Sequence, residues 1–187
     1  CGHDGLHLDP GRFERTRVGE VVYGQGKTLE QIAASLDALG RHHPVLATRV
    51  AEGQGRELLR IFPHGCLWEE ARLFSLGADL LAPDPKAPES DLLIVTAGSS
   101  DLPVAREALG TARFLSLSAS LVSDVGVAGL HRLEPHLASL RQAKVVIAVA
   151  GMEGALPSVL GGLVRAPVIA VPTSTGYGAN FAGLAPL

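Results

Sequence analysis

The carboxylate of Glu153 lies in a turn of small residues that directly follows an apolar run of Val, Ile and Ala at residues 145–149. A β-branched run that ends in such a turn is typical of the carboxyl end of a buried parallel strand, where open α/β sheets bind their ligands. A glycine stands on each side of the Met152–Glu153 pair, and a solvated surface glutamate needs no such backbone freedom. We therefore take Glu153 as the first candidate for acid–base chemistry, with a surface or interface salt bridge as the alternative.

Two further turns follow apolar runs in the same way. After residues 92–96 comes Gly98-Ser99-Ser100-Asp101, whose free amides and helix dipole suit a phosphate or carboxylate, although an ordinary helix N-cap has the same composition. After residues 168–171 comes a loop that can approach a ligand closely and form hydrogen bonds with it, with a plain flexible loop as the alternative. Its candidate binding residues are Thr173, Ser174, Gly176, Tyr177, Gly178 and Asn180.

The segments around these turns alternate between strand and helix patterns. Strict βα order predicts an α/β fold with a doubly wound parallel sheet and right-handed crossovers. Because the carboxyl ends of parallel strands share one edge, we expect the three turns to converge on one pocket that holds Glu153 and Asp101. Pro135 either starts a new helix near Glu134 or kinks the second helix. The expected strands cover residues 92–96, 113–117, 145–149 and 168–171, and the expected helices cover residues 102–109, 127–140 and 156–164.

The first 80 residues predict a small α/β domain of their own. Thr28 can cap a helix with one buried apolar face. Three prolines then mark a semi-rigid linker. We place the small domain at residues 1–82, the Pro-rich linker at 83–90 and the doubly wound domain at 91–187, and expect the last to be C-terminally incomplete. The elements expected in the small domain are a strand over residues 20–23, a helix over residues 29–39 and a strand over residues 44–49.

Composition excludes several classes of function. A net charge of -3 with scattered Lys and Arg argues against nucleic-acid binding. No apolar run approaches the roughly 18 residues of a spanning helix, and the N-terminus is unlike a signal peptide, so we expect a cytoplasmic protein without a membrane partner. Cys1 and Cys66 have no metal or redox spacing, and no histidine lies in a recognisable ligand pattern, so no metal site is predicted. Small molecules are the expected partners.

Four segments together resemble the LarB family, the pyridinium-3,5-biscarboxylic acid mononucleotide synthases of nickel-pincer cofactor biosynthesis. Part of the chain is also similar to the PurE-like mutases that shift a carboxyl group on aminoimidazole ribonucleotide. Those mutases carry a histidine in the loop that here holds Glu153, and a histidine-arginine motif after their second strand, and neither is in place. The closer resemblance is therefore to the LarB family, and it covers nearly the whole chain. Its motifs are the segments 20–28, 124–132, 150–158 and 172–181.

The resemblance implies a PurE-like, flavodoxin-like three-layer domain and an enzyme that acts on nicotinic acid adenine dinucleotide. The enzyme would carboxylate the pyridinium ring with carbon dioxide or bicarbonate and hydrolyse the phosphoanhydride to release AMP. Glu153 would act as base or position the substrate, and Ser100 and Asp101 would orient the dinucleotide. The family's nucleophile is a cysteine, expected downstream of Leu187, and Cys66 is expected to be packed or inert. Further substrate-binding candidates are Gly98, Ser99, Asp124, Gly151, Met152, Gly154, Ala155, Leu156, Arg12 and Lys27, the last two being equally compatible with a solvated surface.

Two other functions stay open at this point: an aminoimidazole ribonucleotide carboxylase or mutase of purine biosynthesis, and a nucleotide-binding regulator without catalysis. No cofactor is firmly implied, although Mg²⁺ would neutralise the charge that develops when a phosphoanhydride is cleaved. The apolar composition and the assemblies of the PurE-like relatives imply a homo-oligomer, with an octamer as one form.

Overall fold

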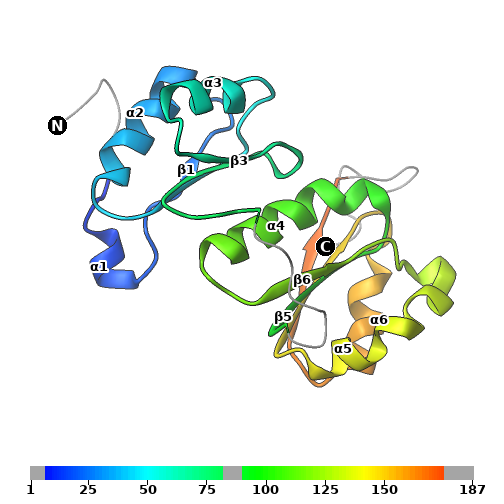
Figure 1. Cartoon of the computed structure of the whole chain (residues 1–187). Coiled ribbons are helices and arrows are strands. Elements are labelled where there is room, and N and C mark those ends of the chain that lie inside the picture. Colours follow the sequence, from blue (N-terminus) through cyan, green and yellow to red (C-terminus); the bar gives the residue numbers. More distant parts are fainter. Residues whose placement is uncertain (1–6, 82–89, 175–187) are drawn as a thin grey trace. The chain divides into compact units, whose positions relative to one another are not determined.

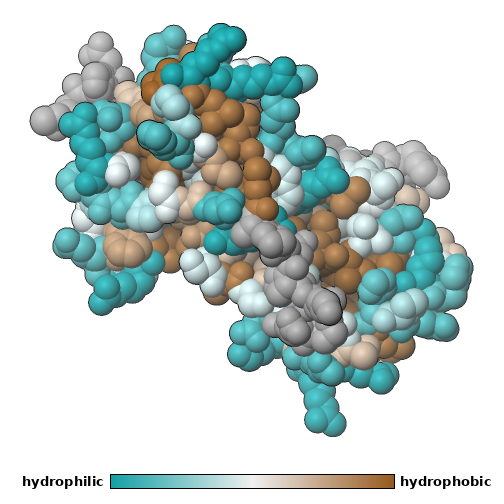
Figure 2. All heavy atoms as spheres, in the orientation of Figure 1, coloured by the Kyte–Doolittle hydropathy of each residue, from teal (hydrophilic) through white to brown (hydrophobic). Residues whose placement is uncertain are grey.

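The structure is a computed structural model that describes residues 7–81 and 90–174. Contacts divide the chain into two compact units, one of residues 1–82 with 113–115 and the other of residues 83–112 with 116–187. The Pro-rich segment expected at residues 83–90 lies almost entirely outside the described residues. Figure 2 shows hydrophilic side chains around much of the outline. Among the described residues, no helix is long and apolar enough to span a membrane.

The first unit is a small α/β sandwich (Figure 1). Its sheet has the strand order β1-β2-β4-β3, with β1 parallel to β2 and the other pairs antiparallel. Helix α2 buries Ile32, Leu36 and Leu39 in the core of this unit, as the apolar spacing predicts. The elements are α1 (Arg12–Thr16), β1 (Val22–Tyr23), α2 (Leu29–Gly40), β2 (Val45–Thr48), α3 (Gln54–Ile61), β3 (Cys66–Trp68), the 3₁₀ helix η1 (Glu69–Ala71) and β4 (Leu73–Leu76).

Thr28 caps helix α2 as predicted. Its hydroxyl accepts from Gln31 N at 3.3 Å, and the Gln31 side chain accepts in return from Thr28 N at 3.1 Å. This reciprocal capping box satisfies two backbone donors that the start of a helix leaves without partners, and so sets the first residue of α2.

The second unit contains the predicted doubly wound parallel sheet. The strand order is β6-β5-β7-β8 and every neighbouring pair is parallel, which is the arrangement of flavodoxin-like folds. Helix α4 covers one face of the sheet, and α5 and α6 cover the other (Figure 1). The elements are β5 (Leu92–Thr96), the 3₁₀ helix η3 (Ser99–Asp101), α4 (Leu102–Phe114), β6 (Ala119–Val122), the 3₁₀ helices η4 (Val127–Arg132) and η5 (Glu134–His136), α5 (Leu137–Gln142), β7 (Val145–Ala150), α6 (Ala155–Leu163) and β8 (Val168–Pro172).

Two elements expected in the second unit are wrong. The strand expected at residues 113–117 does not form there, because α4 continues to Phe114 and the strand is β6. Leu115 and Leu117 are 38% and 51% exposed, so the apolar pattern that suggested a strand marks a surface turn. The single helix expected over residues 127–140 is replaced by η4, η5 and a short α5. One of the two alternatives for Pro135 is confirmed, since η5 starts anew at Glu134.

Candidate functional site

A cleft of about 630 Å³ lies at the carboxyl edge of the parallel sheet in the second unit. The loops that follow β5, β6 and β7 line it, together with Ser174 just beyond β8. These loops meet because all four strands are parallel and so end at the same edge. The lining residues are Ala97, Gly98, Ser100, Asp101, Gly126, Val127, Ala128, Arg132, Ala150, Gly151, Met152, Glu153, Ala155, Leu156 and Ser174.

The structure brings many, but not all, of the candidate residues to this cleft. Ser99, Asp124, Gly154 and Thr173 belong to the same four loops without lining it. Arg12 and Lys27 belong to the first unit. Four candidates lie outside the described residues, namely Gly176, Tyr177, Gly178 and Asn180.

The turn after β7 places Glu153 at the amino end of helix α6. Gly154 N donates to Gly151 O at 3.0 Å and closes the turn. Glu153 is exposed and has no hydrogen-bond or ion-pair partner within the described residues. It directly precedes Gly154, the N-cap of α6, which provides no side-chain cap. Glu153 therefore stands at the amino end of this helix and lines the cleft.

The backbone of this turn corrects one expectation about its glycines. Gly154 has a φ of 63°, in the left-handed region that glycine tolerates. On the other side of Glu153, the left-handed residue is Met152, with a φ of 54°. Gly151, which was expected to supply this backbone freedom, does not have a positive φ. A left-handed conformation costs a non-glycine residue roughly 1 kcal/mol, so the turn holds Glu153 in place through a strained neighbour.

Asp101 connects two of the loops at the cleft. Its side chain is 3% exposed, and its two oxygens accept hydrogen bonds from Gly98 N at 3.0 Å and from Thr173 Oγ1 at 2.7 Å. The first bond shapes the turn after β5, and the second joins that turn to the end of β8. Asp101 thus fixes the position of the loops, and the exposed Ser100 next to it lines the cleft.

The loop after β6 is attached to the end of β5 through Thr96. Asp124 N donates to Thr96 Oγ1 at 3.0 Å, and Val125 N donates to Thr96 O at the same distance. The Asp124 carboxylate pairs with Arg132, at 2.8 Å between Oδ2 and Nη1. Arg132 itself lines the cleft.

Gly126 allows this loop to pass the turn after β5 at close range. A Cβ on Gly126 would lie 2.6 Å from Ala97 O, which is backbone and cannot move aside without shifting the turn. We predict that Gly126→Ala lowers the free energy of unfolding by about 1–3 kcal/mol and weakens ligand binding in the cleft. Urea unfolding followed by circular dichroism measures the first effect.

Gly161→Ala is the matched control for this substitution. Gly161 lies inside helix α6, and nothing lies within 4 Å of a Cβ built there. Alanine at that position should stabilise the protein by about 0.5–1 kcal/mol. Equal effects of the two variants would contradict the close approach at Gly126.

Comparisons with known proteins decide the family. A family model described as LarB/PurE-like N-terminal domain matches residues 3–78, and one described as AIR carboxylase matches residues 91–185. An uncharacterized protein of Methanocaldococcus jannaschii, MJ0165, is 39% identical to this chain, and the match covers 92% of this chain and 70% of the relative. The chain belongs to the LarB family. Its second unit is a PurE-like domain, and the resemblance inferred from the motifs is confirmed.

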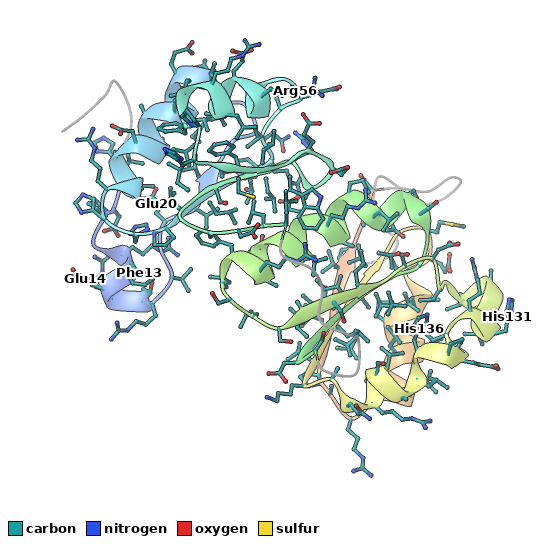
Figure 3. All side chains as sticks on the ribbon, in the orientation of Figure 1. Phe13, Glu14, Glu20, Arg56, His131 and His136 are labelled. Atoms are coloured by element: carbon teal, nitrogen blue, oxygen red, sulfur yellow. The ribbon has the colours of Figure 1, made fainter. Side chains whose placement is uncertain are left out.

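Membership in the LarB family assigns the chain to the carboxylase-type enzymes of the PurE-like carboxylase and mutase class. The second unit has two histidines, His131 and His136, and both lie on the 3₁₀ helices after β6 without lining the cleft (Figure 3). Among the described residues, no group of three or more His, Cys, Asp or Glu side chains is placed to hold a metal ion. The charged groups that line the LarB-family cleft are therefore carboxylates and a guanidinium.

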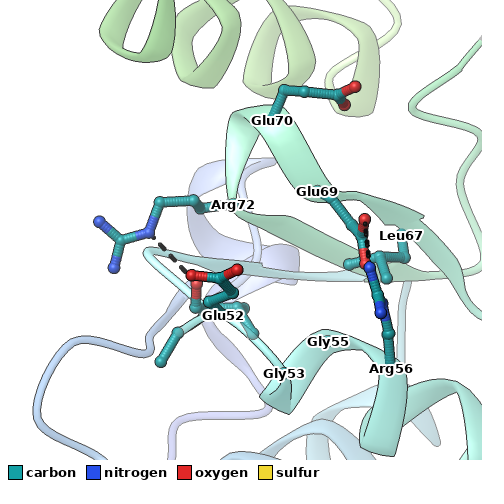
Figure 4. A pocket seen from close by; sticks show the side chains of 10 residues that line it. Glu52, Gly53, Gly55, Arg56, Leu67, Glu69, Glu70 and Arg72 are labelled. Atoms are coloured by element: carbon teal, nitrogen blue, oxygen red, sulfur yellow. Dashed lines mark hydrogen bonds and ion pairs between the residues drawn. The ribbon is translucent and has the colours of Figure 1, made fainter.

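A second cleft, of about 570 Å³, lies in the LarB-type N-terminal unit and holds none of the candidate residues (Figure 4). Arg56 lies over one side of it and donates to Glu69 through Nε at 2.6 Å and Nη2 at 3.3 Å. The hydrogen bond from Arg56 holds the pKa of Glu69 below its usual value, and the same bond raises the pKa of Arg56. Because this cleft holds none of the candidate residues, whereas the cleft of the second unit holds Glu153, the latter is the better candidate for catalysis.

Proposed function

We propose that this protein carboxylates the pyridinium ring of nicotinic acid adenine dinucleotide with carbon dioxide or bicarbonate and hydrolyses the phosphoanhydride. The products would be pyridinium-3,5-biscarboxylic acid mononucleotide and AMP, for nickel-pincer cofactor synthesis. The observation that supports this proposal most is the acidic group at the mouth of the cleft. Glu153 is an unpaired carboxylate within the described residues, in the loop where the resembling mutases carry a histidine.

The chemistry of the ring explains why a carboxylate is useful there. A pyridinium ring is too electron-poor to attack carbon dioxide, so a nucleophile must first add to it and leave a neutral dihydropyridine. The electron-rich carbon of that ring then forms the new bond to carbon dioxide. The same carbon now bears a hydrogen, and removal of this proton and departure of the nucleophile restore the aromatic pyridinium. Covalent catalysis of this kind divides one difficult step into accessible ones.

We assign the removal of the ring proton to Glu153. Its side chain is exposed, lines the cleft and has no partner within the described residues, so a carboxylate oxygen is available to accept the proton. Asp101 would act as a positioning residue, because both of its oxygens hold loop atoms rather than face a ligand. Ser100 would donate to the dinucleotide from the turn after β5.

The nucleophile in this proposal is a cysteine beyond Leu187, and Cys66 has no part in it. Cys66 lies in β3 of the first unit, where its sulfur accepts from Leu80 N at 3.4 Å. We predict that Cys66→Ala leaves the carboxylation rate within about twofold of wild type, because the substituted side chain has a packing role. Mass spectrometry for a pyridine adduct on the full-length protein checks this. Loss of the adduct in Cys66→Ala would reassign the nucleophile.

The experiment that tests the proposed function uses the full-length protein with ¹³C-labelled bicarbonate. One reaction contains nicotinic acid adenine dinucleotide and a second contains carboxylated aminoimidazole ribonucleotide. Label in a pyridine mononucleotide, with one AMP released for each, supports the proposal. Turnover of the imidazole alone would favour the mutase of purine biosynthesis. Binding of the dinucleotide without turnover in either reaction would favour a regulator without catalysis.

We also propose that the active form is a homo-oligomer. The exposed Ile169 on β8, at 51%, and Met152 beside Glu153, at 40%, are apolar side chains that a neighbouring subunit would cover. Static light scattering of the full-length protein tests this, and a monomer at working concentration would contradict it.

A further inference from the structure

Arg132 is the one basic residue among the described residues that line the cleft. It is the last residue of the motif at 124–132, and the proposed mechanism gives it no role. The other charged side chains of the lining are the carboxylates of Asp101 and Glu153. A substrate ring that carries one carboxylate and gains a second brings negative charge into a lining that already holds two acids. Arg132 is the group of opposite charge that this lining offers to such a ring.

The position of the Arg132 guanidinium is set by contacts on two sides. Nη1 donates to Asp124 Oδ2 at 2.8 Å. On the other side lies Gly129, where an added Cβ would come within 2.7 Å of Arg132 Nε and 3.1 Å of Nη2. The guanidinium therefore lies directly against the backbone of Gly129. That contact is available because Gly129 has no Cβ. Gly129 also adopts φ -143° and ψ 63°, which places a kink inside η4.

Asp124, in turn, is fixed to the sheet. Its backbone N–H donates to the hydroxyl of Thr96 at 3.0 Å, and Thr96 is fully buried at the end of β5. Asp124 has a φ of 58°, and this left-handed backbone conformation belongs to the turn from which its carboxylate reaches Arg132. A chain of hydrogen bonds thus runs from the sheet to the guanidinium, which is held in place before any ligand arrives.

The guanidinium keeps capacity for a ligand. It has five N–H donors in a rigid fork, and the bond to Asp124 uses one of them. The Arg132 side chain is 39% exposed, so part of it faces the cleft rather than the protein. A planar carboxylate accepts two parallel hydrogen bonds from such a fork.

We propose that Arg132 binds the ring carboxylate of the pyridinium substrate and thereby selects the acid over the corresponding carboxamide. This inference rests on the proposed function, because it takes nicotinic acid adenine dinucleotide as the substrate. A carboxamide carries no charge and presents an N–H₂ group where the acid has its second oxygen. One donor of the fork would then face another donor, and a site built for paired hydrogen bonds rejects such an analogue strongly.

The phosphates of the dinucleotide are the competing ligand for Arg132, since an arginine fork binds phosphate as readily as carboxylate. Nicotinamide adenine dinucleotide separates the two. It has the same diphosphate and the same adenosine, and differs at the ring in having a carboxamide. A residue that binds the diphosphate affects both dinucleotides equally, whereas a residue that binds the ring carboxylate affects one of them.

The test measures binding of the two dinucleotides to the full-length protein by isothermal titration calorimetry, without bicarbonate. Wild type should bind the acid at least about 10-fold more tightly than the amide, the range expected for one charge-assisted pair. Arg132→Ala should reduce that ratio to about one, because it weakens binding of the acid dinucleotide alone. Arg132→Lys keeps the charge without the fork and should retain part of the ratio. Arg141→Ala, at an exposed arginine near the end of α5, is the matched control and should keep the wild-type ratio.

Each other outcome has a defined meaning. Equal weakening of both dinucleotides by Arg132→Ala would place Arg132 at the diphosphate and overturn the inference. Equal affinities in wild type would do the same. If neither dinucleotide binds, the proposed function fails together with the inference. If the ratio depends on Arg132 and yet no label enters the ring, carboxylate selection stands and the carboxylation proposal fails.

Discussion

Glu153→Gln should reduce carboxylation of the pyridinium ring by about 100-fold or more, the usual contribution of a positioned general base. Glutamine has nearly the same shape but cannot accept the ring proton. Because Glu153 is exposed and has no partner within the described residues, the substitution breaks no hydrogen bond of the fold. We therefore expect the unfolding midpoint and the affinity for the dinucleotide to stay close to those of wild type. Single-turnover assays with labelled bicarbonate measure the loss.

The matched control is Glu134→Gln, at an exposed carboxylate in η5 that does not line the cleft. It should carboxylate at the wild-type rate. If Glu153→Gln kept more than about a tenth of wild-type activity, Glu153 would not be the general base, given the usual size of that contribution. A loss of dinucleotide affinity in place of rate would make it a binding residue.

Asp101→Ala should lower the free energy of unfolding by about 3 kcal/mol, because the carboxylate is buried and both of its oxygens hold loop atoms. Its removal leaves the Gly98 N–H and the Thr173 hydroxyl without this acceptor and releases the turn after β5 from the end of β8. We expect loss of dinucleotide binding as well, since those loops line the cleft. Urea unfolding and calorimetry on the same preparation measure the two effects.

Asp91→Ala provides the comparison for a solvated acid in the same unit. Asp91 pairs with Lys144 at 2.8 Å, and the two side chains are 57% and 73% exposed. Such a pair contributes less than about 1 kcal/mol, so this variant should be nearly as stable as wild type. Similar destabilisation by Asp91→Ala and Asp101→Ala would mean that the buried connection at Asp101 does not hold the loops together.

The parallel sheet could be predicted from the sequence because three of its strands have strong apolar runs with clear turns after them. Strand β7 is the best example, since every residue from Val145 to Ala150 is Val, Ile or Ala. Strand β6 (Ala119–Val122) was missed because it contains Ser120, which is buried at 4% exposure and weakens the apolar pattern. The exposed Leu115 and Leu117 nearby gave a stronger but misleading signal.

The first unit shows a different limit. Helix α2 was predicted because it has both an apolar face and a capping residue, whereas β3 and β4 were not. Gly55 explains part of the difficulty, because helix α3 packs so closely there that a Cβ would lie 2.6 Å from Leu67 Cδ1. A close approach between residues 12 positions apart is a property of the packed structure, and no local pattern of the sequence reports it.

Some residues of the candidate site could be predicted from their position in the sequence, and others could not. Glu153, Ser100 and Asp101 were found because they directly follow strands, and that position alone brings them to one edge of the sheet. Arg132 stands ten residues after the end of β6 and reaches the cleft because the backbone breaks at Gly129. Its pairing with Asp124, eight positions earlier, has no helical or strand spacing that would have indicated it.

The most direct test of this account follows the fate of one hydrogen on the ring. Nicotinic acid adenine dinucleotide with deuterium at the ring carbon to be carboxylated is incubated with ¹³C-labelled bicarbonate and the full-length protein, and the product is read by mass spectrometry. The proposed chemistry predicts a pyridine mononucleotide that has gained the label and lost the deuterium, and far less of it with Glu153→Gln. A pyridine product that keeps its deuterium and carries no label would contradict the proposal.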